Sequence, residues 1–456
     1  MPMRNDERRV VISGIGLICP VGIGLDATWN ALAEGRSGIR KIEAFPVDGL
    51  PTNVGAEVLG FDPMALAIPA HKKPLKKSLK YMARDIRLAV AAAEMAFADA
   101  GLAPGSFDPT RIGLDLGAGL ISTELDELAR GINPSTRADG SFDYAAYGSI
   151  GIPEIEPIWL LKYLPNMLAC HISILWDCQG PSNSITQAET ASLVAIAEAV
   201  RIIQSNRADM MVTGGADSKI HPLSLVRMTL MHQMSSWKGE PGKACKPFDR
   251  HRDGWVAGEG AGILIIEERE HALKRGARIY GEILGCGSGC DAKPGGGLDE
   301  SGIGTEVAYR AALREANLSA DQIGHVNAHG AATLSSDFAE AAALGRVFGN
   351  RTPITALKGY FGNSVSGCGA IELIASLLGV NRGLIPQALN CDSPEFPLDF
   401  VRGESRPTEN LTFATGNLTR HGQTAAVIVR GALLTEQTKA EDAADRAEIA
   451  ELTSKG

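Results

Sequence analysis

Strand-like and helix-like segments alternate along almost the whole chain of 456 residues, and they do so in two successive halves of similar order. The clearest helix covers residues 85–100, where apolar positions recur every three or four residues and Gly101 follows as a stop signal. The predicted strands cover residues 9–14, 111–116, 210–212, 262–266, 325–327, 353–356 and 425–430, and the predicted helices cover residues 25–34, 85–100, 191–204, 304–316, 336–347 and 367–380. This order predicts an α/β protein with a duplicated architecture.

Two segments interrupt this order. Residues 121–165 are rich in Tyr, Trp, Pro and Ile, which is typical of a cap, an interface or a pocket wall. Residues 435–456 are charged and Ala-rich, and we expect a tail without chemistry there. We therefore divide the chain into an N-terminal half (1–268), a C-terminal half (269–434) and this tail.

Composition excludes several classes of protein. A net charge of −9 argues against a nucleic-acid partner, although an acidic carrier protein can still dock on a local basic patch. We find no signal-peptide pattern and no run long enough to span a membrane. The eight cysteines form neither a disulfide framework nor a metal-ligand spacing, so we expect a reduced, cytoplasmic protein without a metal site.

Five motifs carry the strongest information, and they follow one another in order. They are RVVISGIGLICPVGIGLDATWNALAEGRSGI at 9–39, GPSNSITQAETASLVAIAEA at 180–199, KPFDRHRDGWVAGEGAG at 246–262, VNAHG at 326–330 and KGYFGN at 358–363. Over roughly residues 8–434 the chain resembles the β-ketoacyl-acyl carrier protein synthases (ketosynthases). The resemblance implies the thiolase fold, a duplicated five-layer α-β-α-β-α arrangement.

The resemblance also implies a substrate and partners. Family members act on acyl chains carried by the phosphopantetheine arm of an acyl carrier protein and keep no permanently bound cofactor. They form dimers that pair strands across the interface. For this chain the resemblance implies a homodimer, or a heterodimer with a ketosynthase that contains the cysteine.

Carried over position by position, the site is altered. The family places a nucleophilic cysteine at the head of a buried helix, and here that position is Glu189. The first histidine is retained as His329, whereas the second becomes Asn363. The family's lysine is Lys358 and the buried glutamate of the following helix is Glu372.

The substrate contacts of the family are altered as well. Its Thr-X-Thr, which contacts the pantetheine arm, keeps only Thr333. The apolar gate residue of its last loop falls on Arg420, with His421 beside it. Because a buried carboxylate needs a partner, we expect Glu189 to be ionised and held by Arg420, His329 or both. Cys178 and Cys368 lie near these motifs in sequence but not at the nucleophile's position, and small buried side chains explain them.

Three functions fit this pattern. The first is a non-condensing partner subunit of fatty-acid or polyketide assembly, like a chain-length factor, in which Glu189 can be a relic. The second is an acyl- or malonyl-carrier enzyme that decarboxylates or uses Glu189 as a general base. An ionised Glu189 would repel a malonyl carboxylate, which weighs against simple decarboxylation. The third is an ordinary condensing 3-oxoacyl synthase. The sequence leaves open the acyl chain, the pathway and the partner.

Overall fold

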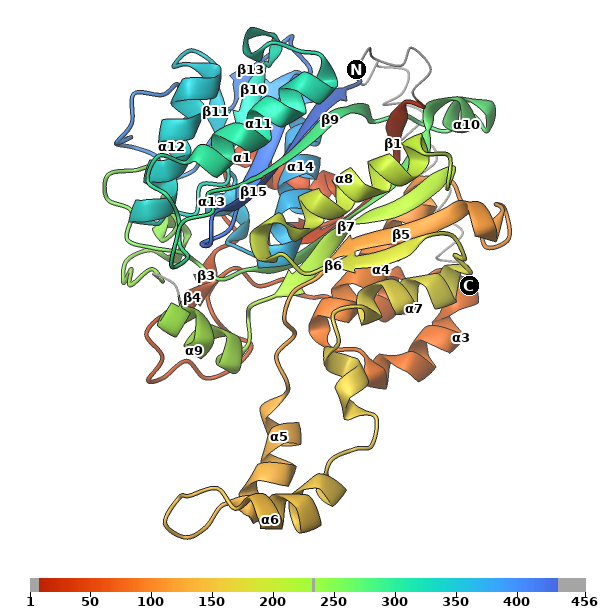
Figure 1. The fold of residues 1–456 in the computed structure, drawn as a ribbon, viewed down its shortest axis with the longest axis vertical. Coiled ribbons are helices and arrows are strands. Elements are labelled where there is room, and N and C mark those ends of the chain that lie inside the picture. Colours follow the sequence, from red (N-terminus) through yellow and green to blue (C-terminus); the bar gives the residue numbers. More distant parts are fainter. Residues whose placement is uncertain (1–7, 232–233, 434–456) are drawn as a thin grey trace.

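The computed structural model describes residues 8–231 and 234–433 and is built on one long, bent path of paired strands (Figure 1). The order along the path is β11-β10-β14-β15-β9-β1-β8-β7-β5-β6. The first five-stranded half contains β1 (Val10–Cys19), β5 (Ile112–Gly117), β6 (Ser182–Ile185), β7 (Met210–Ser218) and β8 (Glu259–Glu268), and the second contains β9 (Gly281–Cys290), β10 (His325–Asn327), β11 (Ile354–Thr355), β14 (Thr412–Leu418) and β15 (Gln423–Gly431).

The two halves of the path meet at a short seam. There β1 pairs with β9 only through Val10, Ile12 and the residue between them, whereas it pairs with β8 along most of its length. Each half therefore behaves as a separate sheet, joined to the other only through these few paired residues.

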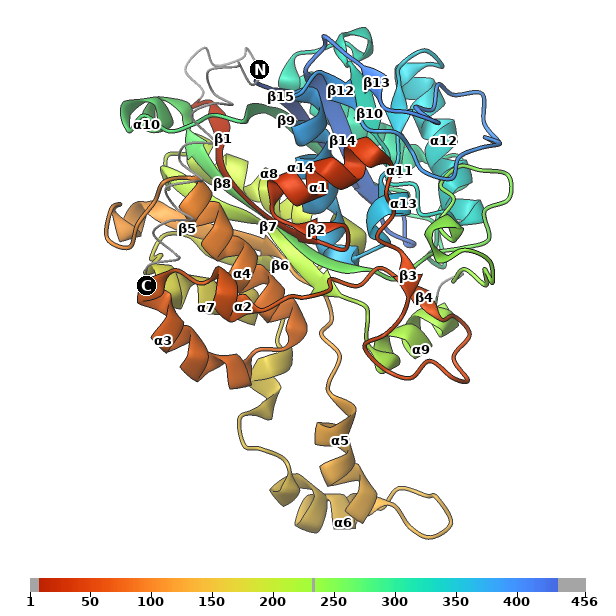
Figure 2. The ribbon, with the colours of Figure 1, turned by 180° about the vertical axis from the view of Figure 1, so that it is seen from behind.

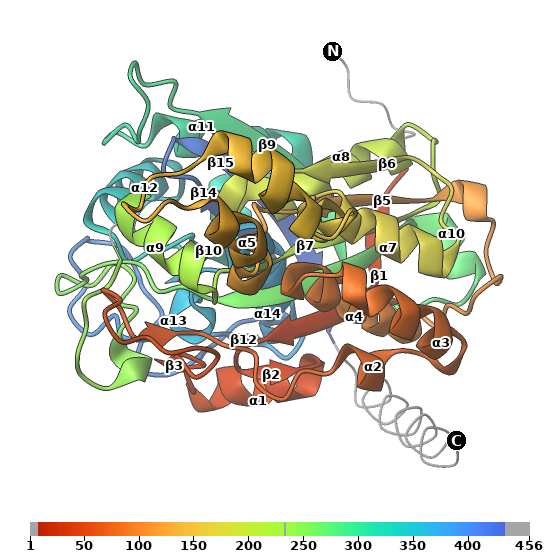
Figure 3. The same cartoon turned by 90° about the horizontal axis from the view of Figure 1, so that it is seen from below.

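Helices form three layers around these two sheets. The central layer holds α8 (Ala191–Gln204) and α14 (Cys368–Val380), whose apolar side chains pack between the sheets. One outer layer holds α4 (Arg84–Asp99) and α7 (Met167–Trp176), and the other holds α11 (Ile303–Ala316) and α12 (Leu334–Phe348). In Figures 1 and 3, α4 and α8 lie on opposite sides of β5 and β7. The predicted five-layer thiolase fold is confirmed.

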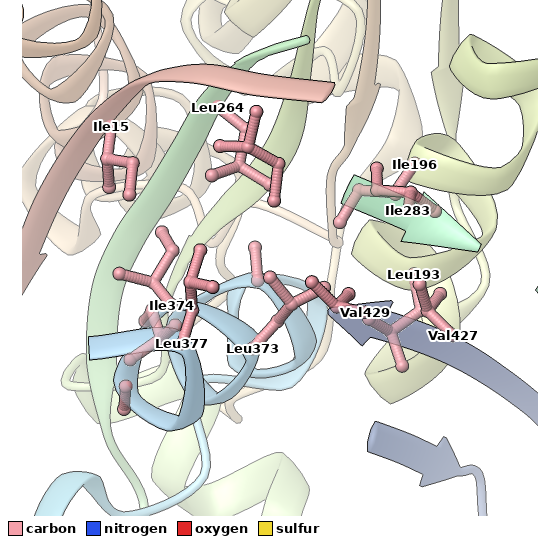
Figure 4. Close-up of a cluster of buried hydrophobic side chains, with 14 of the residues drawn as sticks. Ile15, Leu193, Ile196, Leu264, Ile283, Leu373, Ile374, Leu377, Val427 and Val429 are labelled. Atoms are coloured by element: carbon pink, nitrogen blue, oxygen red, sulfur yellow. The ribbon is translucent and has the colours of Figure 1, made fainter. Parts of the chain in front are cut away.

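Strand alternation explains why both faces of each sheet are apolar. In β8, Leu264 and Ile266 join the central core, while Ile263 and Ile265 face the outer layer of α4. Figure 4 shows the central core, in which Leu264 lies near the α14 side chains Leu373 and Ile374. Burial on both faces gives the continuous apolar runs that a half-exposed strand would not show.

The segment between β5 and α7 leaves the body of the molecule. It carries α5 (Leu125–Ile132) and α6 (Tyr144–Ala146) and forms a separate lobe (Figures 1 and 2). Large apolar side chains remain uncovered on it, with Tyr144 82% exposed and Ile152 54% exposed. The sequence placed an insertion here, at residues 121–165.

Several shorter elements surround the layers, and the predicted tail at 435–456 lies outside the described residues. The remaining helices are α1 (Leu25–Glu34), α2 (Pro63–Leu66), α3 (Pro69–Ser78), α9 (Pro222–Met231), α10 (Arg269–Lys274) and α13 (Lys358–Phe361), and the remaining strands are β2 (Gly22–Ile23), β3 (Arg40–Lys41), β4 (Val54–Gly55), β12 (Leu384–Ile385) and β13 (Arg406–Pro407). Within the described ranges, no helix combines the length and apolarity needed to cross a bilayer.

Candidate active site

Glu189 lies at the head of α8, in a tight 3₁₀ turn (Ala188–Thr190) that runs into the helix. Its side chain is buried, at 4% exposure, while the preceding Ala188 is exposed and has a left-handed φ of 46°. The end of β5 passes very close to this helix start, because a Cβ on Gly117 would come within 2.4 Å of Ser192 N. The sequence correctly placed Glu189 at the start of a buried helix.

Opposite this helix, His329 is held by Lys358 and by Asn417 from β14. Lys358 Nζ lies 2.7 Å from Glu372 Oε1, 2.8 Å from the His329 carbonyl and 3.1 Å from His329 Nδ1. Asn417 Nδ2 lies 2.9 Å from Glu372 Oε2 and 3.1 Å from the same Nδ1. Sequence analysis assigned no role to Asn417; its only signal there is a single amide side chain within β14.

These contacts fix the protonation state of His329. Both groups facing Nδ1 are N–H donors, so Nδ1 must accept and the ring proton must sit on Nε2. Burial, reinforced by the Lys358 charge, lowers the pKa of His329 well below its usual value. The ring is thus a neutral hydrogen-bond donor, suited to polarising a carbonyl rather than to exchanging protons.

The Lys358–Glu372 pair is a buried salt bridge, with each side chain only 1% exposed. Burial acts to lower the pKa of Lys358, but the charge and hydrogen bond of Glu372, together with the nearby Cys368 and Glu340, outweigh it and leave the pKa raised. Lys358 is therefore a permanent cation whose role is to hold His329. Lys358, Glu372 and His329, each carried over separately from the family's pattern, are brought together by this geometry.

Glu189 differs from its expected state. Burial raises the pKa of Glu189. Its own backbone N–H, the charge of Lys358, the neighbouring Asn363 amide and the charge of Lys219 oppose this only in part. The Asn363 Oδ1 accepts from Val365 N at 2.9 Å, while its Nδ2 is buried and has no hydrogen-bond partner among the described residues. The carboxyl therefore favours its neutral form more than an ordinary glutamate does.

The expected ion pair between Glu189 and Arg420 is wrong. Arg420 is exposed; it donates to the Met231 carbonyl, and its Nε lies 3.1 Å from His421 Nε2. Among the described residues no ion pair joins Arg420 to Glu189, nor His329 to Glu189. Arg420 lies in the turn between β14 and β15, and its guanidinium donates to the Met231 carbonyl at the end of α9 instead.

Two cavities meet at Glu189. An outer cavity of about 600 Å³ also reaches His329 and Thr333, and an inner cavity of about 310 Å³ lies beside it. Glu189, Met231, Arg420 and His421 line both. Asn363, Lys358 and Glu372 line neither; they support the walls from behind. The outer cavity is lined by Glu189, Met231, Trp255, Lys293, Gly295, Gly296, Gly297, Leu298, Glu300, His329, Ala331, Thr333, Ser335, Ser336, Leu418, Arg420 and His421.

No cysteine of the described residues lines either cavity. The Cys368 thiol is buried behind the site and donates to the Glu189 carbonyl at 3.5 Å. Burial raises the pKa of Cys368 well above its usual value, and raises that of Cys178 to about 12. Both thiols stay protonated, which is the inert state of a buried cysteine. No cluster of His, Cys, Asp and Glu in residues 8–231 and 234–433 could hold a metal ion.

The backbone around the site is strained. Ala188, Ala332 and Val365 all have positive φ, at 46°, 63° and 49°, which L-residues with a Cβ rarely adopt. Each lies within three residues of a predicted site residue: Glu189, His329 or Asn363. Strain of this kind persists where surrounding structure over-determines the backbone, and it clusters at functional sites.

Family models identify the chain. The model described as Beta-ketoacyl synthase, N-terminal domain matches residues 7–272, and Beta-ketoacyl synthase, C-terminal domain matches residues 280–392. The chain belongs to the β-ketoacyl synthase family. It is 33% identical to 3-oxoacyl-[acyl-carrier-protein] synthase 2 of Vibrio cholerae, over 93% of this chain and 99% of the relative.

Solved structures agree with this assignment. The ishigamide ketosynthase/chain length factor matches with a TM-score of 0.80 and 28% identity, covering 93% of this chain and 99% of the other. A type II polyketide synthase acyl-carrier protein in complex with its ketosynthase, bound to the hexaketide, matches with a TM-score of 0.80 and 26% identity, covering 93% and 100%.

Proposed function

We propose that this protein is a non-condensing ketosynthase-like subunit of fatty-acid or polyketide biosynthesis. The observation that carries the proposal is the carboxyl of Glu189 at the head of α8, where the condensing mechanism needs a thiolate. An acyl group on a carboxylate would be an anhydride, which is far less stable than the thioester that would donate it. Transfer to Glu189 is therefore uphill, and Cys178 and Cys368, the cysteines that lie near the altered motifs in sequence, are buried, protonated thiols.

The remaining site supports binding of an acyl thioester without transfer. His329 Nε2–H is a fixed donor for a thioester carbonyl, and the outer cavity that it lines leads past Thr333. Such a pocket suits the phosphopantetheine arm of an acyl carrier protein as the substrate carrier. The protein then needs no resident cofactor.

The surface offers a place for an acidic carrier. α3 and the turn after it expose five lysines on a chain of net charge −9. Their charge favours docking of an acidic partner such as an acyl carrier protein. These lysines are Lys72, Lys73, Lys76, Lys77 and Lys80.

Dimerisation belongs to the same proposal. The partner is a second copy or a ketosynthase that retains its cysteine. β6 is the last strand of its sheet, and Ser182 and Asn183 on it are exposed. An open strand edge is a surface on which strands can pair.

A second candidate is an acyl-thioester enzyme that uses Glu189 as a general acid or base. What favours it is the combination of open cavities that reach Glu189 and a carboxyl pKa raised by burial. A carboxyl whose pKa moves toward neutrality can transfer protons at physiological pH. The location of Glu189 at the helix head weighs against a third reading, an ordinary condensing enzyme.

Intact-mass spectrometry after incubation with acylated carrier protein tests the proposal. We expect no acyl adduct on the wild-type protein, whereas Glu189→Cys should gain one, since it restores a thiol at the helix N-terminus. A stable adduct on the wild-type chain would overturn the proposal. Co-purification with a cysteine-containing ketosynthase, followed by mass spectrometry of carrier-bound products, separates the two candidates: products that require both chains favour the partner subunit.

A further inference from the structure

The inner cavity has an unusual charge balance for a pocket beside an acyl site. Its lining contains one carboxyl, that of Glu189, against three permanently cationic side chains: Lys219, Arg227 and Arg420. Apolar side chains complete it, including Leu120, Met228 and Val365. At about 310 Å³ it falls in the size range of small-molecule sites.

Only one of these three cations is neutralised. Lys219 is buried. Its Nζ lies 2.5 Å from Asp217 Oδ1 and donates to the Leu120 carbonyl at 3.2 Å. Arg227, on α9, is half-buried and has no acidic partner among residues 8–231 and 234–433. Within the same ranges Arg420 contacts only the Met231 carbonyl and His421.

Two guanidinium groups thus border one cavity without a counter-charge. They come from different elements, Arg227 from α9 and Arg420 from the turn between β14 and β15. A guanidinium that is partly removed from water, as that of the half-buried Arg227 is, gains most from a carboxylate, which it can bind through two parallel hydrogen bonds. The exposed Arg420 can add further donors. Among the described residues Glu189 is the one carboxyl that lines this cavity, and no ion pair joins it to either arginine.

The position of the inner cavity indicates which ligand would place a carboxylate there. The outer and inner cavities share Glu189, Met231, Arg420 and His421, and the carbonyl donor His329 lines the outer one. A thioester that enters through the outer cavity therefore directs the far end of its acyl chain into the inner one. The apolar residues suit its methylene groups, and the two arginines suit its terminus.

We propose that the inner cavity selects acyl groups that carry a carboxylate at the end distant from the thioester. This inference rests on the proposed function, since it takes an acyl thioester as the ligand of the site. It deepens that function by naming the substrate class as dicarboxylic rather than purely aliphatic acyl chains.

Binding of two matched probes to the full-length protein tests the inference. One probe is an amide analogue of adipoyl-pantetheine, which cannot be hydrolysed; in the other an isopropyl group replaces the terminal carboxylate. Calorimetry should show the carboxylate probe binding about tenfold or more tightly, as expected for a charge-assisted bidentate contact. Arg227→Met should abolish most of this preference while leaving the affinity for the isopropyl probe and for free pantetheine unchanged.

Each other outcome is decisive. Equal affinity for both probes, or a preference that Arg227→Met leaves intact, overturns the inference while the proposed function stands. An Arg227→Met variant that loses both probes equally also overturns it, because the arginine would then only shape the wall. If neither probe binds, the inference fails together with the acyl-binding part of the proposed function, whereas the absence of an acyl-enzyme is judged separately by intact mass.

Discussion

At the scale of single residues, the site is a set of buried polar groups whose states are fixed by their neighbours. Lys358 uses its three protons on Glu372, on the His329 carbonyl and on His329 Nδ1. Glu340 adds to this by accepting the backbone N–H of His329 at 2.7 Å and of Gly330 at 2.9 Å. His329 is therefore immobilised through its ring and its main chain together.

Removing the counter-charge of Lys358 should be strongly destabilising. We expect Glu372→Gln to lower the free energy of unfolding by about 3–5 kcal/mol, because it leaves a buried ammonium without a partner. Urea unfolding measures this, with the exposed Glu409→Gln as a control that should change stability by less than about 0.5 kcal/mol. A loss below about 1 kcal/mol for Glu372→Gln would mean that water reaches Lys358.

The raised pKa of Glu189 predicts a definite pH dependence. A carboxyl whose pKa is higher in the folded state binds protons more tightly there, so stability falls as pH rises above the unfolded value of about 4.3 and through the folded pKa. Glu189→Gln cannot ionise. The unfolding free energy of Glu189→Gln should therefore increase relative to that of the wild type as pH rises, by at most about 1.4 kcal/mol per pH unit.

Chemical unfolding of both proteins between pH 4 and pH 8 checks this sign. The two curves should approach each other at the acid end, where Glu189 is protonated and resembles glutamine. If the unfolding free energy of the wild type instead increases relative to that of Glu189→Gln as pH rises, Glu189 is a carboxylate stabilised by cations, as the sequence alone had predicted.

At the scale of elements, the turn that starts α8 holds Glu189 in place at the expense of backbone strain. Ala188 has φ of 46° and is exposed, so its methyl group gains nothing from burial. A left-handed conformation is unfavourable by roughly 1–2 kcal/mol for a residue with a Cβ. A glycine at this position would relieve that strain. Its greater flexibility in the unfolded chain, however, would reduce the resulting gain in stability by about 0.5–1 kcal/mol.

We therefore expect Ala188→Gly to raise the unfolding free energy by about 0.5–1 kcal/mol. The matched control is Ala191→Gly, a buried position three residues later in regular helix, which should lose about 1 kcal/mol or more. Thermal and urea unfolding distinguish the two. If both variants lose stability, the strain at Ala188 is absent in solution.

Elements that follow periodicity were predictable, and side-chain directions were not. The helix at 191–204 and the buried strand at 262–266 agree with α8 and with part of β8, because burial on both faces leaves an unbroken apolar pattern. Glu189, His329 and Lys358 came from motif positions and lie close to one another as expected. Arg420 failed because its direction depends on the Met231 carbonyl, which is distant in sequence, and Asn417 was missed because one amide in a strand carries no pattern of its own.

At the scale of the whole molecule, the lobe and the β6 edge leave apolar and unpaired surface uncovered. Tyr144 and Ile152 on the lobe are more than half exposed, as is Leu230 at the end of α9. Apolar patches of this kind mark interaction surfaces. We expect light scattering to show a dimer at micromolar concentration, either of this chain alone or with a ketosynthase that retains its cysteine.

A lysine on the strand edge should weaken that dimer. Asn183→Lys places a charge on the exposed β6, a substitution that opposes pairing of edges. The control is Val307→Lys on α11, which is 47% exposed and belongs to the outer layer of the other sheet. We expect the first variant to dissociate at several-fold higher concentration than the second. A wild type that is monomeric with and without the partner, or equal behaviour of the two variants, would contradict a β6 interface.

The short seam between β1 and β9 has a consequence for how the protein can be taken apart. Few backbone hydrogen bonds connect the sheets there, so their attachment depends on the interior that α8 and α14 fill for both. This interior belongs to both halves, because each half contributes one of the two helices. The chain should therefore melt in a single cooperative transition, and a half cut out at the seam would lose one wall of its own core. The internal duplication does not make either half a module that can be transplanted.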